Sequence, residues 1–444
     1  MFLKEKFSYN NIILVSLAFL TLAGCHTLFG TSDDDREPRR ERERPKRVAP
    51  MDYQPEVMKP PPADIRSVQL YHGEDRKSAP ILNLDDSDSE LTLRFDQLSS
   101  RNRLFRVRVT HYNQGWVKSN LSRSFYLRGL RQSEITRGRA SSVQNPAYTH
   151  YSYTFPGDFN IEVSGNYLLE VYSYQDDELL FALPFFVSEE VGELSTSIEQ
   201  LYTGAGGHRL SHQLFSNYRY PDFVQMPQQD LDFYFVQNQF WGKATRATQR
   251  DVTGSGQVRT YISRDNVFPG QYEFRELNIE ELRADGRRII EYRPEMIPPR
   301  IYLFRDIVDL NVQPYSRTSN RFPSLIDDRN ARYAEVRFEL EVPDDLRNDD
   351  PIYLVGPFNN WKINEANRMS YDSDRGTFTG GAVMKQGRYD YKYVVKTEDG
   401  IDDLRLDATF FDGFQEYHTL AYYRDRQLGA DRLLHIDRKT IRSR

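Results

Sequence analysis

Short runs in which apolar and polar residues alternate recur along most of this chain, and they restrict its fold more than any other feature. Clear examples are residues 91–95 (LTLRF), 105–109 (FRVRV) and 151–155 (YSYTF). A period of two places one face of a strand on a core and the other in water. Turn sequences such as NQG, PGD and SGN separate the runs. No long helical pattern with paired caps follows residue 25, so we expect an all-β chain rather than an α/β fold.

The aromatic content and the length agree with several β domains. The 444 residues include 29 Tyr and 27 Phe, and aromatic rings fit the pleated, half-buried surfaces of strands. A chain of this length can form roughly two to four domains, each with its own core. The density of strands and turns predicts tandem immunoglobulin-like β-sandwiches. We expect them at residues 64–190, 191–330 and 331–444.

The first residues have the order of a secretory signal. Lys4 and Lys6 precede an apolar stretch at residues 12–22, which is too short for a stable transmembrane helix. The stretch leads into LAGC, in which Cys25 is the single cysteine of the chain. This ending resembles the lipobox of bacterial lipoproteins, which implies removal of residues 1–24 as a signal peptide and lipidation of Cys25. The alternative is an ordinary signal peptide with a chance cysteine.

Residues 25–63 have the composition of a disordered linker. An acidic cluster (SDDD) is followed by a run of mixed charge, and prolines concentrate toward the end of the segment. Such a segment buries too little apolar surface to fold, and proline favours extended geometry. We therefore expect a solvated spacer between the lipid and the body. The acidic cluster is similar to the surface-export signals of some lipoproteins, but it lies several residues late.

The charge and the cysteine count exclude several classes of function. A net charge of −6 and a pI of about 5.9 give no reason to expect a nucleic-acid partner. One cysteine cannot form a disulfide framework, and a cysteine-based metal site would lack its second thiolate. Nucleophile elbows, phosphate loops and zinc-binding helices with the required spacing are also absent from the sequence.

Three features that could carry chemistry have simpler explanations. His111 and His150 fall at strand ends, and a catalytic role would need a partner carboxylate that the sequence does not reveal. The acidic run at residues 85–90 could suggest calcium, but it lacks the glycine and the spaced ligands of an EF-hand loop. Residues 204–208 (GAGGH) lack the lysine and the following helix of a phosphate loop. We therefore expect no catalytic residue, no cofactor and no metal site.

The last predicted domain carries a more specific pattern. The sequence GPFNNW at residues 356–361 is followed by GRYDYKY at residues 387–393. This pattern resembles the immunoglobulin-like glycogen-binding module, in which a GxFNxW turn and a later GxYxYK strand recur. In that family a sugar stacks on an aromatic platform beside polar groups, which implies Trp361 and Lys392 as candidate glycan-binding residues. The alternative is that Trp361 fills the end of the sandwich.

A wider set of motifs runs from residue 65 to residue 434. The earlier ones are LTLRFDQL at 91–98, His111 with Trp116, YTHY at 148–151 and SGNYLLEVY at 164–172. The later ones are QN with Trp at 237–241, FPG at 268–270, KQG at 385–387, EYHTLAYYR at 416–424 and DRL at 431–433. Together they resemble the type IX secretion system plug protein family. The chain departs from that family at Tyr112, where members usually carry cysteine, and near residues 317–322, where their Asp-Asn-Gly loop is missing.

The resemblance to the plug proteins implies a function. A member would dock on the periplasmic end of a very large outer-membrane secretion barrel and close its pore when no cargo is passing. This implies a non-enzymatic lipoprotein, lipid-anchored on the periplasmic face of the outer membrane, whose protein partner is the barrel. No family catalytic residue or cofactor exists to carry over. The alternative is a surface-exposed lipoprotein that binds a glycan through Trp361 and Lys392.

Overall fold

The computed structural model describes most of the chain after residue 51. The described residues are 52–202, 210–252, 256–270, 272, 274–308, 323–326, 329–344, 349–398, 400–407 and 413–443. They are nearly all in strands and turns, and the α-helices among them, α1 (Arg123–Tyr126) and α2 (Pro227–Asp230), have four residues each. The expected all-β fold class is therefore confirmed. Cys25, the signal peptide, residues 204–208 and the loop near residues 317–322 lie outside the described residues.

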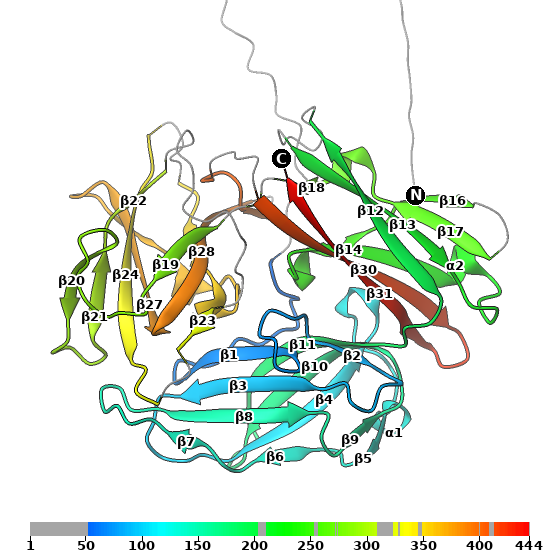
Figure 1. The fold of residues 1–444 in the computed structure, drawn as a ribbon, viewed down its shortest axis with the longest axis horizontal. Helices are drawn as coiled ribbons and strands as arrows, with labels where there is room; N and C mark the ends of the chain where they lie inside the picture. The colour runs from blue at the N-terminus through cyan, green and yellow to red at the C-terminus, as the bar shows by residue number, and fades with distance from the viewer. Residues whose placement is uncertain are drawn as a thin grey trace, which may run out of the picture. The chain divides into compact units, whose positions relative to one another are not determined.

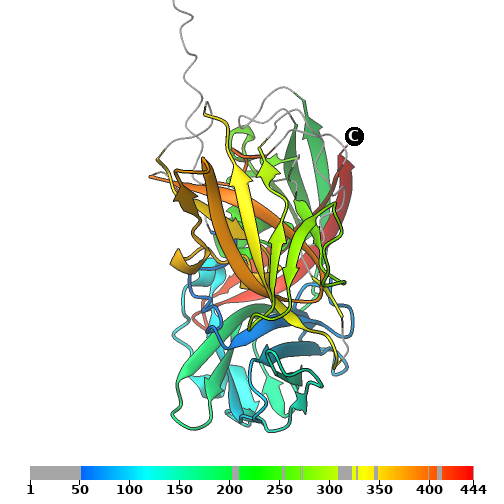
Figure 2. The ribbon, with the colours of Figure 1, turned by 90° about the vertical axis from the view of Figure 1, so that its left-hand side faces the viewer.

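The first sandwich packs two sheets face to face (Figures 1 and 2). One sheet has the order β1-β3-β8-β7, from β1 (Ile65–His72), β3 (Leu91–Gln97), β8 (Thr149–Phe155) and β7 (Arg139–Ala140). The other has the order β2-β11-β10-β4-β6, from β2 (Ile81–Asn83), β11 (Leu179–Ser188), β10 (Gly165–Ser173), β4 (Phe105–Tyr112) and β6 (Ser133–Ile135). A short pair, β5 (Leu127–Gly129) and β9 (Phe159–Ile161), follows α1.

Alternating apolar residues from both sheets fill the core of the first sandwich. Phe95 of β3 stacks on Tyr151 of β8 with ring centroids 5.0 Å apart, and Phe105 of β4 meets Phe95 edge-on at 5.1 Å. Offset and edge-on ring pairs add stability beyond the apolar area that they bury. The central strand β10 is apolar on both faces because both are covered. Leu169 points into this core, whereas Leu168 packs in a separate cluster on the opposite face.

The second sandwich also has two sheets with a shared core. Its first sheet contains β12 (Glu193–Leu201), β13 (Ser211–Arg219), β17 (Gln257–Tyr261) and β16 (Gln249–Val252), with β18 (Phe268–Pro269) paired to β13. Its second sheet has the order β15-β14-β30-β31, from β15 (Thr245–Arg246), β14 (Leu231–Gln237), β30 (Gly413–Asp425) and β31 (Ala430–Ser443). Tyr218 of β13 and Phe233 of β14 meet between the sheets.

The third sandwich is built around the long strands β24 (Tyr333–Glu341) and β28 (Gly387–Thr397). Beside β28 lie β19 (Arg275–Asn278), β23 (Ser324–Leu325), β25 (Ile352–Val355) and β29 (Gly400–Asp402). The sheet of β24 also contains β20 (Ile289–Arg293), β21 (Arg300–Leu303), β22 (Asp306–Ile307), β27 (Thr377–Lys385) and β26 (Ser370–Asp372). Val336 and Tyr391 belong to the core between the two sheets.

The sheets do not divide the chain at residue 330, so the predicted boundaries between the last two domains need correction. The closing strands β30 and β31, red in Figure 1, lie beside green β14, with which β30 pairs. Conversely, β19 to β23 belong to the third sandwich, where β19 pairs with β28 and β21 with β24. The returning strand β30 covers an edge of β14 that would otherwise expose unpaired backbone groups. The second sandwich therefore combines residues 193–269 with residues 413–443.

Residues 52–63, which we name the strap, fold onto the body instead of continuing the predicted linker. Tyr53 is fully buried and Met58 is nearly so. Lys59 forms a β-bridge with Ala182 of β11, whose N–H donates to the Lys59 carbonyl at 3.0 Å. The predicted linker boundary at residue 63 is therefore too late. The two buried side chains, backbone hydrogen bonds and an ion pair between Asp52 and Lys362 hold this proline-containing segment on the body.

Among the described residues, no helix has the length and the apolar character needed to cross a bilayer.

Candidate functional site at the junction of the sandwiches

The strap meets the second and third sandwiches in a cluster of aromatic rings, which we name the aromatic junction. It contains Tyr53 from the strap, Phe240 after β14, and Phe274 and Trp361 from the third sandwich. The Tyr53 ring lies 4.6 Å from that of Phe240 and 5.7 Å from that of Trp361, centroid to centroid. Phe240 and Trp361 are 5.3 Å apart. The rings meet edge-on or tilted, as aromatic pairs prefer, and they bind three separate parts of the chain together.

The strap lies so close to the second sandwich that the contact requires a glycine. The backbone N–H of Gly242 donates to the carbonyl of Tyr53 at 3.1 Å. A Cβ atom at Gly242 would lie 2.3 Å from the Asp52 carbonyl oxygen and 2.4 Å from that of Gln54. Both neighbours are backbone atoms, so neither can turn aside as a side chain could. Glycine at this position allows the strap to lie in its groove.

Trp361, one of the two predicted glycan-binding residues, is turned inward by its loop. The 3₁₀ turn η5 (Pro357–Asn359) leads into Asn360 and Trp361, which both have left-handed backbones with φ of 53° and 58°. The Asn359 side chain fixes the turn, because it accepts from the Gly356 N–H and donates to the Leu354 carbonyl. The Trp361 side chain is 5% exposed. It packs in the aromatic junction and is not an exposed platform on the surface; the small part that stays open lines the pocket described below.

Lys392, the other predicted glycan-binding residue, is also buried. It is 1% exposed and forms an ion pair with Asp407, while its ammonium group lies 4.3 Å from the Tyr272 ring centroid. Its strand, β28, is covered on this face by residues that follow β29. The structure therefore contradicts a surface glycan platform made of Trp361 and Lys392. A single sequence shows the residue types of such a platform but not the segments that cover them.

A second lysine joins Lys392 to form a buried ionic cluster beside the aromatic junction. Lys243 pairs with Asp403, and the Tyr272 hydroxyl donates to the same carboxylate. Burial alone would raise the pKa of Asp403, but the charges of Lys243 and Lys392 overcome it and lower the pKa to about 2. Burial raises the pKa of Asp407 and lowers that of Lys243. Two cations face two carboxylates, so the cluster carries no large net charge into the interior.

The first and third sandwiches meet around Asp96 of β3. His150 Nδ1 lies 2.6 Å from Oδ1 of this carboxylate, and the Tyr333 hydroxyl donates to Oδ2 at 2.8 Å. Lys385 pairs with the same carboxylate from β27. Tyr333 also bonds to the Ser67 hydroxyl at 2.7 Å. Tyr333 and Lys385 of the third sandwich both contact Asp96 of the first sandwich, so this group fixes the contact between the two sandwiches.

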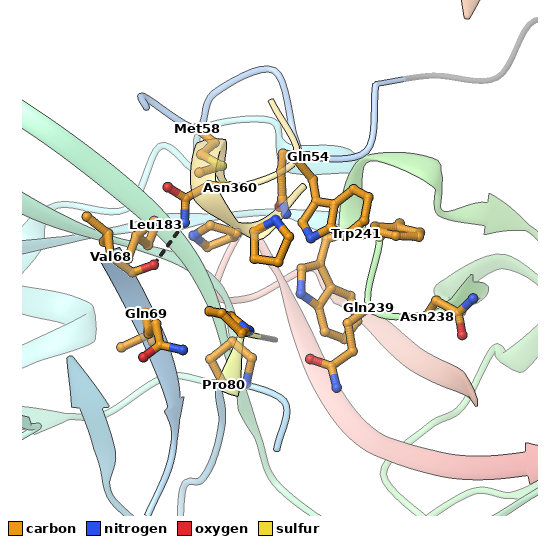
Figure 3. A pocket seen from close by; sticks show the side chains of 16 residues that line it. Gln54, Met58, Val68, Gln69, Pro80, Leu183, Asn238, Gln239, Trp241 and Asn360 are labelled. Carbon is orange, nitrogen blue, oxygen red and sulfur yellow. Dashed lines mark hydrogen bonds between the residues drawn. The ribbon is translucent and has the colours of Figure 1, made fainter. Parts of the chain in front are cut away.

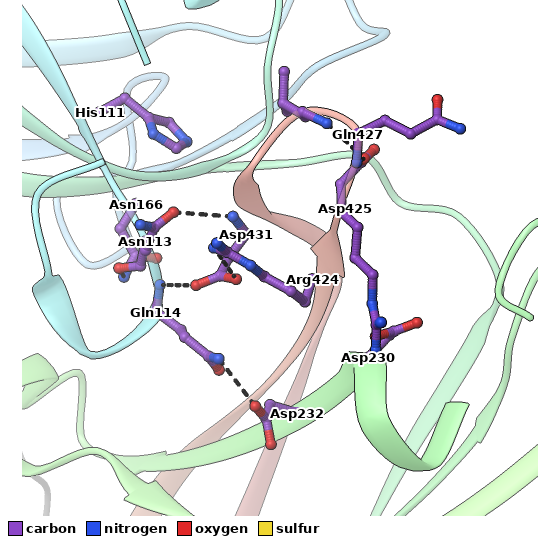
Figure 4. Close-up of polar contacts among 12 residues, drawn as sticks. His111, Asn113, Gln114, Asn166, Asp230, Asp232, Arg424, Asp425, Gln427 and Asp431 are labelled. Carbon is purple, nitrogen blue, oxygen red and sulfur yellow. Dashed lines mark hydrogen bonds and ion pairs between the residues drawn. The ribbon is translucent and has the colours of Figure 1, made fainter. Parts of the chain in front are cut away.

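The first and second sandwiches meet through side-chain amides and carboxylates (Figure 4). The Asp431 N–H donates to the Asn113 side-chain oxygen at 2.9 Å, and the Gln114 N–H donates to the Asp431 carboxylate at 3.2 Å. The buried Tyr422 hydroxyl donates to the Asn166 side-chain oxygen at 2.6 Å. Buried polar contacts of this kind hold one orientation, because any other would leave the groups without partners.

The motif residues behind the family resemblance gather at these contacts. His111 Nε2 lies 3.1 Å from the Ser164 carbonyl, so this nitrogen carries the proton and donates. A Cβ at Gly165 would lie 2.5 Å from that nitrogen and 3.3 Å from the Asp431 carbonyl oxygen. The glycine of SGNYLLEVY therefore lets three segments approach one another. His111 therefore binds a backbone carbonyl of its own sandwich, and His150 contacts the Asp96 carboxylate described above.

A pocket with a cavity volume of about 100 Å³ opens beside the strap, where all three sandwiches contribute to its walls (Figure 3). We name it the junction pocket. Its apolar walls include Trp241, Trp361 and several prolines, and its polar groups are the side-chain amides of Gln54, Gln69, Asn238, Gln239 and Asn360. Sequence reasoning missed this pocket, because its walls come from segments as far apart in the chain as Gln54 and Trp361. Two motifs that the sequence analysis identified supply lining residues, namely QN with Trp at 237–241 and GPFNNW at 356–361.

Within the described residues, no group of three or more His, Cys, Asp and Glu side chains is placed to hold a metal ion. The acidic run at residues 85–90 forms local turns, in which Asp86 accepts from the Asp88 N–H at 2.9 Å and Asn83 accepts from the Asp85 N–H at 3.1 Å. Such side-chain-to-backbone bonds are typical of Asx turns.

Comparison with known proteins agrees with this architecture. Residues 65–189 match the family model described as "Type 9 secretion system plug protein 1st domain". Among solved structures, a hypothetical protein from Parabacteroides merdae ATCC 43184 is 22% identical, with a TM-score of 0.76 over 87% of this chain and 99% of that chain. It therefore shares the fold. No curated protein matches the chain.

A bacterial adhesin from Mobiluncus mulieris, at 7% identity, covers 46% of this chain and 96% of its own, but its TM-score of 0.16 gives the likeness no weight. The family match spans the first sandwich, which contains the motifs His111 to Trp116, YTHY and SGNYLLEVY. The first sandwich therefore matches the first domain of the type 9 secretion system plug proteins, which indicates a role related to type IX secretion.

Proposed function

We propose that this protein closes the periplasmic end of the type IX secretion translocon when no cargo occupies the pore. The observation that carries the proposal is the match of residues 65–189 to the first domain of the plug proteins. In this proposal the protein acts by shape and contact. It makes and breaks no covalent bond, and it needs no cofactor or metal.

The way the sandwiches are joined supports a mechanical role. Contacts between domains of one chain are by default polar and mobile. Here they include the buried pairs Lys385 with Asp96 and Tyr422 with Asn166, and also the strap. A protein that closes a pore must resist deformation. Three domains held in fixed contact resist deformation better than three domains that move separately.

The first sandwich also offers a surface on which the translocon could dock. Val117, Phe125 and Leu130 are 64%, 63% and 49% exposed. Phe125 belongs to α1, Leu130 directly follows β5, and Val117 directly follows the 3₁₀ turn at Gln114–Trp116. Exposed cations, including Lys118 and Arg131, alternate with them. Large apolar side chains ringed by polar ones are typical of protein interfaces, which bury about 1,600 Å² in stable complexes. We assign the barrel contact to this surface.

Lipidation of Cys25 would complete the arrangement. A lipid on this cysteine, at the periplasmic face of the outer membrane, raises the local concentration of the body near the barrel. Docking could then be reversible, because tight intrinsic affinity would not be required. Reversibility suits a closure that must leave when cargo arrives.

Deletion of the gene in a strain with a functional translocon tests the proposal. We expect hypersensitivity to bulky antibiotics, restored by the wild-type protein but not by Phe125→Ser combined with Leu130→Ser. The matched control replaces Ile297, a 72% exposed residue of the third sandwich, by serine, and should restore the barrier. Unchanged permeability after deletion would overturn the proposal. A tagged copy should also co-purify with the barrel.

A further inference from the structure

The junction pocket contains buried amide atoms without hydrogen-bond partners. Gln69 and Gln239 are 8% and 5% exposed, and Figure 3 shows them on opposite sides of the pocket. Gln69 Nε2 and Gln239 Oε1 have no partner among the described residues, and the same holds for Gln54 Oε1. The Gln239 amide is held in place, because its Nε2 donates to the Lys77 carbonyl at 3.2 Å and to Glu416 at 2.9 Å. Such orphaned donors and acceptors are costly unless another molecule satisfies them.

The lining of the pocket restricts the chemistry of that molecule. No charged side chain lines it, so a phosphate, carboxylate or ammonium group would be buried without a counter-charge. The polar groups are neutral amides that offer both donors and acceptors. The indole rings of Trp241 and Trp361 and the rings of Pro80 and Pro357 supply apolar walls. The pocket therefore fits an uncharged ligand with an apolar side and with both N–H and C=O groups.

The same junction already binds an extended peptide, namely the strap. Gly242 and Ala182 donate backbone hydrogen bonds to the strap carbonyls, and Tyr53 and Met58 fill apolar sites. The pocket continues this contact directly, because Gln54 and Met58 of the strap form part of its wall. Main-chain hydrogen bonds combined with side-chain pockets are the general means by which proteins recognise extended peptides.

We propose that the junction pocket is a binding site for a second extended peptide, a segment of a partner protein with an uncharged apolar anchor residue. The anchor packs against Trp241 and Trp361. Its neighbouring backbone N–H donates to Gln239 Oε1, and a backbone carbonyl accepts from Gln69 Nε2. This site lies apart from the apolar surface of α1 and β5, and it does not depend on the protein being a plug.

Selection of a phage-displayed random heptapeptide library on the purified full chain tests the site. We expect enrichment of peptides without charge at their central positions, and synthetic copies should bind saturably in titrations followed by tryptophan fluorescence. Gln69→Leu keeps the volume and removes the donor. Loss of one neutral hydrogen bond should weaken binding roughly 3- to 10-fold. The melting temperature of this variant should hold or rise, because the replacement removes a buried amide nitrogen without a partner.

Gln97→Leu is the matched control. Gln97 is also 8% exposed, also has an amide atom without a partner, and does not line the pocket. Peptide binding should be unchanged in this variant. If Gln69→Leu lowers the yield of folded protein, Gln69→Met repeats the test. Absence of any enriched peptide that responds to the Gln69 variants would overturn the proposal, and so would Gln69-dependent binding of maltotriose or chitotriose in place of peptides.

Discussion

The ammonium nitrogen of Lys385 on β27 lies 2.8 Å from Oδ2 of Asp96 on β3, and the two side chains are 5% and 1% exposed. The residues are 289 positions apart in the chain. Their contact joins the first and third sandwiches at a point from which water is excluded. Tyr333 donates to the same oxygen, so the carboxylate is the centre of this interface.

Replacing Asp96 by asparagine should destabilise the protein strongly. The lysine would remain buried without its carboxylate, and breaking a buried pair in this way typically costs about 3–5 kcal/mol. Urea denaturation followed by far-UV circular dichroism measures the change in the free energy of unfolding. Lys385→Met alone and the double variant complete a double-mutant cycle. Strictly additive effects would contradict the coupling of the two residues.

The strands of the first sandwich were predictable because local pattern decides them. Residues 91–95 and 151–155 alternate clearly, and they form β3 and β8 with Phe95 and Tyr151 facing the core. The turn sequences NQG and PGD also stand between strands. Strands β3 and β8 pair with each other, so local and tertiary preferences agree here.

The exchange of strands between the last two sandwiches was not predictable from local pattern. Residues 416–424 read as a strand, but nothing in their alternation shows that they pair with β14, whose partner residues lie 180 to 192 positions earlier. Such pairings depend on which sheet edge is open when the chain returns. The buried ionic cluster was equally hidden, since Lys243 and Asp403 lie 160 residues apart. Charge in a sequence is usually assigned to the surface.

Replacing Gly242 by alanine should release the strap. The new Cβ would overlap two strap carbonyls, and neither can move without displacing Tyr53. Hydrogen exchange should then increase at residues 52–63, and the free energy of unfolding should fall by about 2 kcal/mol or more. Gly380→Ala on β27 is the control, because its nearest neighbour is the flexible Met369 side chain. Unchanged exchange in the strap of Gly242→Ala would contradict the close approach.

Replacing Trp361 by alanine should cost stability without affecting sugar binding. The indole packs against Tyr53, Phe240 and Phe274, and removing a large buried aromatic side chain typically costs about 3–5 kcal/mol. Thermal unfolding measures this loss. Titration of the wild-type protein with maltooligosaccharides should give no saturable change in tryptophan fluorescence. A saturable response that Trp361→Ala abolishes, while the protein remains folded, would restore the glycan-binding hypothesis.

Mild acid should destabilise the protein through two buried histidines. Burial lowers the pKa of His111 and that of His212 to about 4, from an ordinary value of 6.5. At pH values between these two numbers, the histidines are protonated in the unfolded chain and neutral in the folded chain. The free energy of unfolding is therefore unaffected by these histidines above about pH 6.5, and it decreases as the pH falls toward about 4. Each histidine should contribute roughly 1 kcal/mol per pH unit within this window. Urea unfolding at several pH values measures the slope.

Glutamine at position 111 separates this effect from general acid unfolding. Its amide can still donate to the Ser164 carbonyl, as His111 Nε2 does, but it does not titrate. The His111→Gln variant should therefore lose about half of the histidine-dependent slope. His72→Gln serves as the control, because the His72 side chain is exposed. If both variants retained the wild-type slope between about pH 4 and 6.5, the prediction for His111 would be wrong. The lowered pKa values of Asp96 and Asp403 place the loss of their charge below about pH 4, so these carboxylates do not affect the slope in this window.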